Sequence, residues 1–140
     1  MLSSPNLILS MTFISLLVAS TLIRIWLGRR QVSYIQQNRN QVPSAFSENI
    51  TLDAHQKAAD YTIAKLRLGI IENGVSAIIL IGFTLLGGLQ ILNMALLQLL
   101  GEGIPQQMAL LVSIVLISGV LDIPFSWYKQ FHLEERFGFN

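Results

Sequence analysis

The amino-acid sequence predicts an all-α integral membrane protein with three transmembrane helices and a cytoplasmic amphipathic helix between the first and the second. Two observations support this fold class. Hydrophobic residues make up 52% of the 140 residues and charged residues only 12%, whereas a soluble domain carries about 25% charge. Three runs nearly free of charge are each long enough to cross a bilayer, which takes about 20 apolar residues. We expect the whole chain, residues 1–140, to form one transmembrane domain.

The composition also excludes several classes of function. The net charge is +1 and the nine basic residues are dispersed, so no nucleic-acid partner is expected. The chain has no cysteine, which excludes disulfides, thiolate catalysis and sulfur-ligated metals. His55 and His132 are its two histidines and lie far apart in the sequence, so a zinc site would need carboxylates as well. The partner that the composition predicts is the lipid bilayer.

The first apolar run covers about residues 5–27 and predicts the first transmembrane helix. Arg24 lies one turn from its end and can extend toward the interface, where Trp26 is also favoured. A cleaved signal peptide is the competing interpretation, but it requires basic residues before a shorter apolar core. No Lys or Arg precedes Arg24. We therefore expect an uncleaved helix.

A polar segment of about residues 28–73 follows, and it predicts an amphipathic helix. Val42-Pro43 requires an extended step, and Thr51 can cap a helix that begins at Leu52 with Asp53 in its first turn. Apolar residues then recur at helical spacing on one face: Leu52, Ala59, Ile63, Leu66 and Ile70. We expect this helix to pack on its neighbours or to lie at the membrane surface.

The second apolar run, about residues 74–100, contains no charged residue and predicts one long helix. Its second half holds three amides that are expected to hydrogen-bond to another helix or to line a wet cavity: Gln90, Asn93 and Gln98. Three glycines allow another backbone to come close: Gly82, Gly87 and Gly88. These features favour helix packing over ligand binding.

The segment Gly101-Glu102-Gly103-Ile104-Pro105 predicts a tight hairpin loop before the third transmembrane helix, about residues 104–127. Pro124 removes one helical donor and is expected to kink or stop that helix. Residues 128–140 are expected to form a cytoplasmic tail. The basic residues follow the first helix or lie in this tail, whereas the 101–107 loop has none. The positive-inside rule therefore puts the amino terminus outside and the carboxyl terminus in the cytoplasm.

No zinc-protease HExxH, phosphate-binding loop or GxSxG motif is present. Asp122 is the ionisable residue within an apolar run, and such residues are functional candidates. The alternative is an interfacial acid that pairs with Lys129 or Arg136. Glu134 and Glu135 suit a general acid or a metal ligand, but two acids on a solvated face are commoner.

Two long motifs resemble the type I CAAX prenyl proteases. The first resembles the first cytoplasmic segment of that family: Val42-Pro43, Phe46, Thr51-Leu52, His55-Gln56-Lys57-Ala58-Ala59-Asp60-Tyr61-Thr62 and Ala64-Lys65. The second resembles the segment that follows the third helix of that family: Asp122-Ile123-Pro124-Phe125-Ser126-Trp127-Tyr128, Phe131 and Glu134-Glu135-Arg136-Phe137-Gly138-Phe139-Asn140. The motifs stand in the same order as in the family, with matching helices between them.

This resemblance implies the membrane region of a zinc metalloendopeptidase whose helices surround a water-filled chamber. In that family an HExxH motif and a distant Glu hold the zinc, and the enzyme cuts farnesylated peptides near the carboxyl terminus. This chain has no HExxH, so the resemblance implies an amino-terminal fragment that ends before the catalytic motif, with no catalytic or metal-ligating residue and no cofactor of its own. Candidate chamber or substrate contacts are Asp122, Trp127, Tyr128, Glu134, Glu135 and Arg136.

The partners implied by the resemblance are the remaining helices and catalytic part of the parent protein, and a peptide or protein substrate. In a bacterial source the location would be the inner membrane, and the substrates would be peptides or membrane proteins rather than prenylated chains. The alternative function is a free-standing three-helix membrane scaffold or subunit with no enzymatic role.

The chain should need detergent or lipid to stay monodisperse, because three uncharged runs cannot all be buried within 140 residues. Size-exclusion chromatography with and without detergent measures this. A monomeric, detergent-free peak with a folded spectrum would contradict a membrane protein.

Overall fold

The computed structural model describes residues 4–44 and 49–138, so Phe46 and the terminal Phe139-Asn140 of the motifs lie outside the described residues. The described elements are all helical, and each begins and ends as follows: α1 Ser4–Asn38, α2 Leu52–Thr84, α3 Gly88–Leu100, α4 Ile104–Tyr128, the π-helical η2 Lys129–Glu134 and the short α5 Glu135–Phe137.

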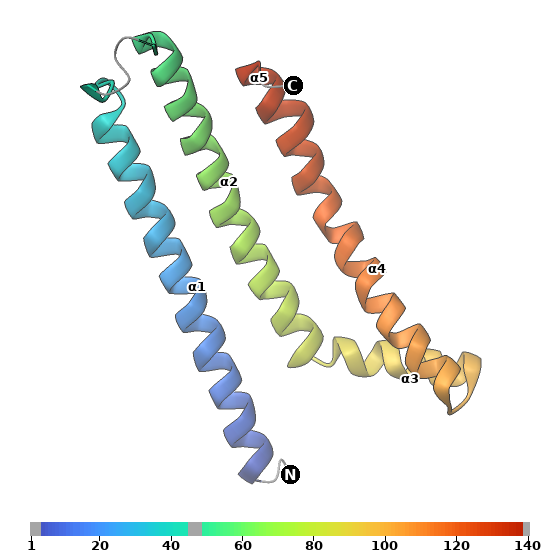
Figure 1. Ribbon diagram of the computed structural model, residues 1–140. Helices are drawn as coiled ribbons and strands as arrows, with labels where there is room; N and C mark the ends of the chain where they lie inside the picture. Colours follow the sequence, from blue (N-terminus) through green and yellow to red (C-terminus); the bar gives the residue numbers. More distant parts are fainter. Residues whose placement is uncertain (1–3, 45–48, 139–140) are drawn as a thin grey trace.

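α1 and α2 run antiparallel and lie side by side (Figure 1). α3 runs across the lower end of the structure, and α4 then returns toward the upper end. η2 and α5 continue α4, so the carboxyl end lies near the start of α2 while the amino terminus lies at the opposite end. Three long helices therefore run between the same two ends.

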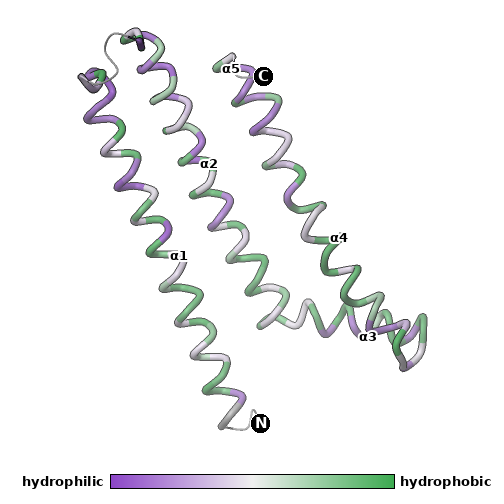
Figure 2. The backbone as a smooth tube through the Cα atoms, in the orientation of Figure 1, coloured by the Kyte–Doolittle hydropathy of each residue, from purple (hydrophilic) through white to green (hydrophobic). Residues whose placement is uncertain are grey.

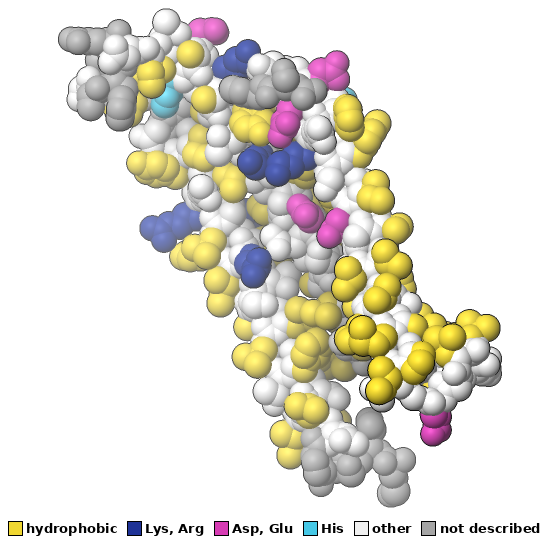
Figure 3. All heavy atoms as spheres, turned by 45° about the vertical axis from the view of Figure 1, so that its right-hand side comes forward, with side chains coloured by type: hydrophobic (Ala, Val, Ile, Leu, Met, Phe, Trp, Pro, Cys, Tyr) yellow, Lys and Arg dark blue, Asp and Glu magenta, His cyan; other side chains and the backbone are white. Residues whose placement is uncertain are grey.

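Three helical stretches of the described chain are long and apolar enough to cross a membrane: Asn6–Asn38, Leu52–Thr84 and Ile104–Phe137. Hydrophobic residues fill their lower and middle parts, and hydrophilic residues gather at the upper end (Figure 2). Figure 3 shows the same division on one face, with Lys and Arg side chains in the upper half and hydrophobic side chains along α4. The prediction of three transmembrane helices in an all-α chain is confirmed.

α1 is longer than the predicted helix of residues 5–27, because it continues to Asn38. Residues 28–38 are rich in Arg and Gln, which favour helix, and no proline occurs between residues 28 and 42. At about 1.5 Å per residue, the 35-residue helix is about 52 Å long, against a bilayer core of about 30 Å. The last turns of α1 therefore extend beyond the membrane.

The amphipathic helix predicted to begin at Leu52 is not a separate element, because residues 52–73 form the first part of the continuous α2. The predicted start is confirmed, since the Thr51 side chain accepts a hydrogen bond from Ala54 N at 3.2 Å. The change from polar to apolar sequence near Gly74 marks a change of solvent and does not end the helix. Nothing in the helix geometry requires an end there, because Gly74 keeps helical backbone.

The prediction of one helix over residues 74–100 is also wrong, because α2 ends at Thr84 and a separate helix, α3, begins at Gly88. The amides of Leu85 and Leu86 both donate to Ile81 O, at 2.8 and 3.2 Å. Gly87 then has a φ of 84°, a left-handed conformation that favours glycine. The 13 residues of α3 reach about 20 Å, which is too short to cross the membrane.

The hairpin predicted at residues 101–105 is confirmed, and α4 follows it from Ile104 to Tyr128. Gly101 and Gly103 both have positive φ, and Pro105 stands in the first turn of α4. Pro124 lies inside α4 and does not stop it. The predicted tail of residues 128–140 is instead helical as far as Phe137, through η2 and α5.

The tightest packing lies at the upper end, where α1, α2 and η2 meet. Ala59, Ile63 and Leu133 are the hydrophobic residues that are buried within the described part of the chain. On α1, Gly28 allows close approach of α2, since a Cβ there would lie 3.0 Å from the Ile70 side chain. Elsewhere large apolar side chains of all the long helices face outward, as surfaces toward lipid or further helices do.

Replacing Gly88 with Ala should destabilise the bend between α2 and α3. The added Cβ would lie 3.0 Å from both Gly82 O and Phe83 Cα, which are backbone atoms that cannot rotate away. A loss of about 1–3 kcal/mol is expected from such overpacking. Thermal unfolding in lipid nanodiscs measures it. Gly82→Ala is the matched control, because its Cβ would meet nothing within 4 Å. Equal melting temperatures for the two variants would contradict this account of the bend.

Candidate functional site

A cavity of about 430 Å³ lies between α2, α3 and α4 at the apolar level of the structure. Its walls are mainly aliphatic and aromatic, with four polar side chains among them. The lining residues are Ser76, Ile79, Leu80, Phe83, Thr84, Leu89, Ile114, Ile117, Ser118, Leu121 and Asp122. An apolar hollow with a few polar groups is the usual form of a binding site for a small or extended ligand.

The bend after Thr84 creates this cavity, because it directs α3 away from α2 and opens the space beside α4. A buried hydrogen bond then fixes α3 against α4: Gln106 Nε2 donates to Asn93 Oδ1 at 2.5 Å, and Gln106 is only 6% exposed. The prediction that an amide of residues 74–100 bonds to another helix is confirmed for Asn93. Gln90 and Gln98 are exposed.

The carboxyl-terminal segment forms a second candidate region on η2 and α5. Its aromatic rings pair along the helix, with centroids 6.1 Å apart for Trp127 and Phe131 and 4.9 Å apart for Tyr128 and His132. Trp127 and Tyr128 remain exposed. A π-helical stretch of this kind inside a longer helix is frequent at functional sites.

This segment docks on the first half of α2. Leu133 is buried at 5% exposure, and the Phe137 ring meets the Tyr61 ring edge to face with centroids 5.7 Å apart. The guanidinium of Arg136 lies 5.8 Å from the centroid of the Phe137 ring. The segment is therefore anchored by its apolar side, while Glu135 and Arg136 remain exposed.

The six candidate contacts predicted from sequence do not converge on one point. Asp122 borders the apolar cavity, whereas Glu134, Glu135 and Arg136 lie 12 to 14 residues further along one continuous helix. That separation corresponds to about 18–21 Å. Trp127 and Tyr128 lie between them. The candidates thus divide into a cavity residue and a charged segment at the polar end.

An ion pair fixes the polar end of the α1–α2 pair. Arg39 donates from Nε and Nη2 to the two carboxylate oxygens of Asp60, each at 2.7 Å. The hydrogen bonds to Asp60 raise the pKa of the Arg39 guanidinium above its already high value. His55 Nε2 lies 3.3 Å from Asn38 O in the same region. These contacts orient α2 relative to the end of α1.

Sequence reasoning missed the polar members of the cavity wall, Ser76, Thr84 and Ser118. Isolated hydroxyl residues inside apolar runs are a weak signal, since such side chains also bond to their own helix. Thr84 does so, donating to Leu80 O at 2.6 Å. The Tyr61–Phe137 contact was also missed, because it joins residues 76 positions apart.

The described residues do not fit a zinc ion, because no three His, Asp or Glu side chains among them are grouped to hold a metal. His55 lies in the first turn of α2, beside the end of α1, while His132 of η2 stacks on Tyr128. Within the described part of the chain, Glu134 and Glu135 are therefore not joined by the further His, Asp or Glu ligands that a zinc site requires.

The chain matches a known protein family. The family described as CAAX prenyl protease N-terminal, with five membrane helices, matches residues 31–140. The chain belongs to this CAAX prenyl protease N-terminal family. No curated protein and no solved structure matches the chain. The matched residues include α2, α3, the cavity between α2, α3 and α4, and the carboxyl-terminal segment.

Membership and helix composition agree that the chain is a multi-pass membrane protein, the amino-terminal membrane region of a protease of this family. Three helices of spanning length occur in its described part, together with the shorter α3. The resemblance inferred from the two motifs is confirmed. The cavity and the carboxyl-terminal segment are therefore both parts of a CAAX prenyl protease N-terminal region.

The isolated chain should retain less than one zinc ion per molecule after dialysis, since its described residues hold no three-ligand cluster. Atomic absorption on detergent-purified protein measures the bound metal. Stoichiometric zinc that disappears in His55→Ala or His132→Ala would overturn this expectation.

Proposed function

We propose that this chain forms part of the chamber wall of a membrane-embedded zinc metalloendopeptidase and contacts its peptide substrate, without supplying the catalytic groups. The observation that supports the proposal best is the cavity between α2, α3 and α4, which lies wholly within the residues that match the protease family. Such a wall requires apolar surface for the substrate and a few fixed polar groups. Both occur in the cavity lining.

The zinc and its ligands belong, in this proposal, to another part of the protease. No reaction step is assigned to residues of this chain. Asp122 would contact the substrate from the cavity rim, and the exposed Glu135 and Arg136 would provide fixed charges at the chamber edge. Trp127, Tyr128 and Glu134 would form the adjoining surface.

The proposal also includes an orientation. The upper end, with Arg39 and the carboxyl-terminal segment, would face the cytoplasm, and the amino terminus and the Glu102 loop would face the opposite side. The distribution of basic residues supports it, since the loop of residues 101–107 has none. The charged segment would then meet substrates on the cytoplasmic side.

The test uses the polypeptide encoded by the complete gene, in nanodiscs, with a quenched fluorescent peptide as substrate. Chelation of zinc should abolish cleavage. Asp122→Asn, Glu135→Gln and Arg136→Ala should each lower kcat/KM by about tenfold, the effect of losing one charged hydrogen bond. Their melting temperatures should stay near that of the unchanged protein, because all three side chains are exposed.

Glu102→Gln is the matched control, since it removes one exposed acid in the α3–α4 loop, at the opposite end of the structure, and should leave kcat/KM unchanged. Unchanged turnover in all three test variants would defeat the substrate-contact proposal. A complete gene product without zinc-dependent cleavage would instead favour the three-helix scaffold.

A further inference from the structure

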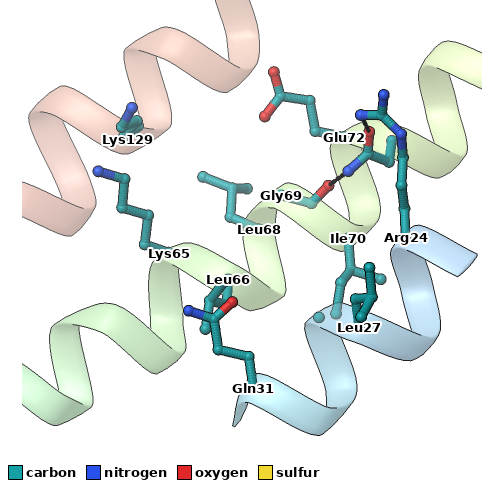
Figure 4. Close-up of a pocket in the computed structure, with 12 residues that line it drawn as sticks. Arg24, Leu27, Gln31, Lys65, Leu66, Leu68, Gly69, Ile70, Glu72 and Lys129 are labelled. Carbon is teal, nitrogen blue, oxygen red and sulfur yellow. Dashed lines mark hydrogen bonds between the residues drawn. The ribbon is translucent and has the colours of Figure 1, made fainter. Parts of the chain in front are cut away.

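A second cavity, also of about 430 Å³, lies between α1, α2 and η2. Three basic side chains from three different elements line it: Arg24 of α1, Lys65 of α2 and Lys129 of η2. In Figure 4 the Lys65 side chain extends toward the helix that carries Lys129, whereas Arg24 lies beside Glu72 at the opposite end of the view. Glu72 is the one acidic residue in the lining.

Lys65 and Lys129 lie near the polar boundary of the hydrocarbon core. Lys65 stands 19 residues before the end of α2 at Thr84, which is about 28 Å and approaches the core thickness of about 30 Å. Lys129, in the first turn of η2, lines the same cavity. Arg24 lies deeper, because it bonds to Asn73, which is about 12 Å from Lys65 along α2.

The cations are only partly satisfied within the described chain. Arg24 Nη1 donates to Asn73 Oδ1 at a long 3.5 Å, and Asn73 Nδ2 in turn donates to Gly69 O at 2.8 Å. Lys65 lies 5.8 Å from the Tyr61 ring centroid. Neither the Lys129 side chain nor the Glu72 side chain forms an ion pair or hydrogen bond with a described residue. Three formal positive charges against one negative charge leave an excess that suits an anion.

The rest of the lining is amphipathic. Leu27, Leu66, Leu68 and Ile70 provide apolar surface, and Gln31 and Asn73 provide amide donors. Leu27 and the outer faces of α1 are exposed, so the cavity adjoins surface that would face acyl chains. A bound group at this depth would therefore combine a phosphate with an apolar tail.

We propose that this cavity is a binding site for the phosphate headgroup of an anionic phospholipid. Lys65 and Lys129 contact the phosphate, Gln31 hydrogen-bonds to one of its oxygens, Arg24 adds to the positive potential of the cavity, and the acyl chains lie along α1. Basic pockets between transmembrane helices bind such headgroups by this combination of charge and depth. The site does not depend on the proposed peptidase function, because its residues and ligand are different.

The experiment places the full chain in nanodiscs of equal phosphatidylglycerol and phosphatidylcholine and counts co-purifying lipids by native mass spectrometry. The unchanged chain should retain phosphatidylglycerol selectively. The double variant Lys65→Gln with Lys129→Gln should retain about 25-fold less, because each basic residue near an anionic headgroup contributes about fivefold.

The control double variant, Arg29→Gln with Arg67→Gln, removes the same two charges from exposed positions on α1 and α2 that do not line the cavity. It should retain phosphatidylglycerol within about twofold of the unchanged chain. Helix content by circular dichroism and the elution volume show that both variants are folded.

Equal losses in the two double variants would mean diffuse surface attraction and would overturn the site, as would retention without lipid preference. Titration of inorganic phosphate in phosphatidylcholine nanodiscs, followed by ³¹P line broadening, tests whether the cavity binds free phosphate and not a lipid headgroup. Phosphate binding that depends on Lys65 and Lys129, without phosphatidylglycerol preference, would overturn the lipid assignment. So would selective binding of a peptide with a free carboxylate over its amide.

Discussion

Hydrocarbon offers no hydrogen-bond partner to a peptide group, and this constraint controls the rest of the structure. Within the membrane each backbone N–H and C=O has to be paired inside its own helix. Long helices of 33 and 25 residues in α2 and α4 satisfy the requirement, and α1 does so over 35 residues. The glycine turns that join α2 to α3 and α3 to α4 gather at one end of the structure, while Thr51 caps α2 at the other.

The break between α2 and α3 then determines where a ligand can lie. The left-handed Gly87 and the close backbone contact of Gly88 direct α3 across the end of the structure, and Gln106 ties α3 to α4. α4 is thereby held beside α2, and the two helices contact through η2 and α5 at the polar end. A cavity lined by α2, α3 and α4 follows from this geometry.

Much of the fold follows from local chemistry that the sequence displays. Apolar length predicts the number of spans, although the second occupies Leu52–Thr84 and not residues 74–100. Thr51 predicts the start of α2, and the glycines and Pro105 predict the second turn. The helix boundaries were harder to predict from the sequence, because the polarity of a residue indicates the solvent around it and not its backbone conformation. α1 and α2 both continue through a change in polarity, at Gly28 and near Gly74. The helix is instead interrupted at Gly87, which lies within an uncharged run.

The candidate site was predicted only in part, because sequence motifs carry no information on distances between elements. Asp122 borders a cavity, yet the charges of Glu135 and Arg136 lie about four turns away on the same helix. The contact of Tyr61 with Phe137 and the cavity that Arg24, Lys65 and Lys129 line depend on how whole helices pack. The most direct test of the three-crossing arrangement exploits the absence of cysteine, through single cysteines at Asn40 and Glu102 in sealed membrane vesicles. A membrane-impermeant maleimide should label the two positions from opposite sides, and labelling of both from one side would contradict the arrangement.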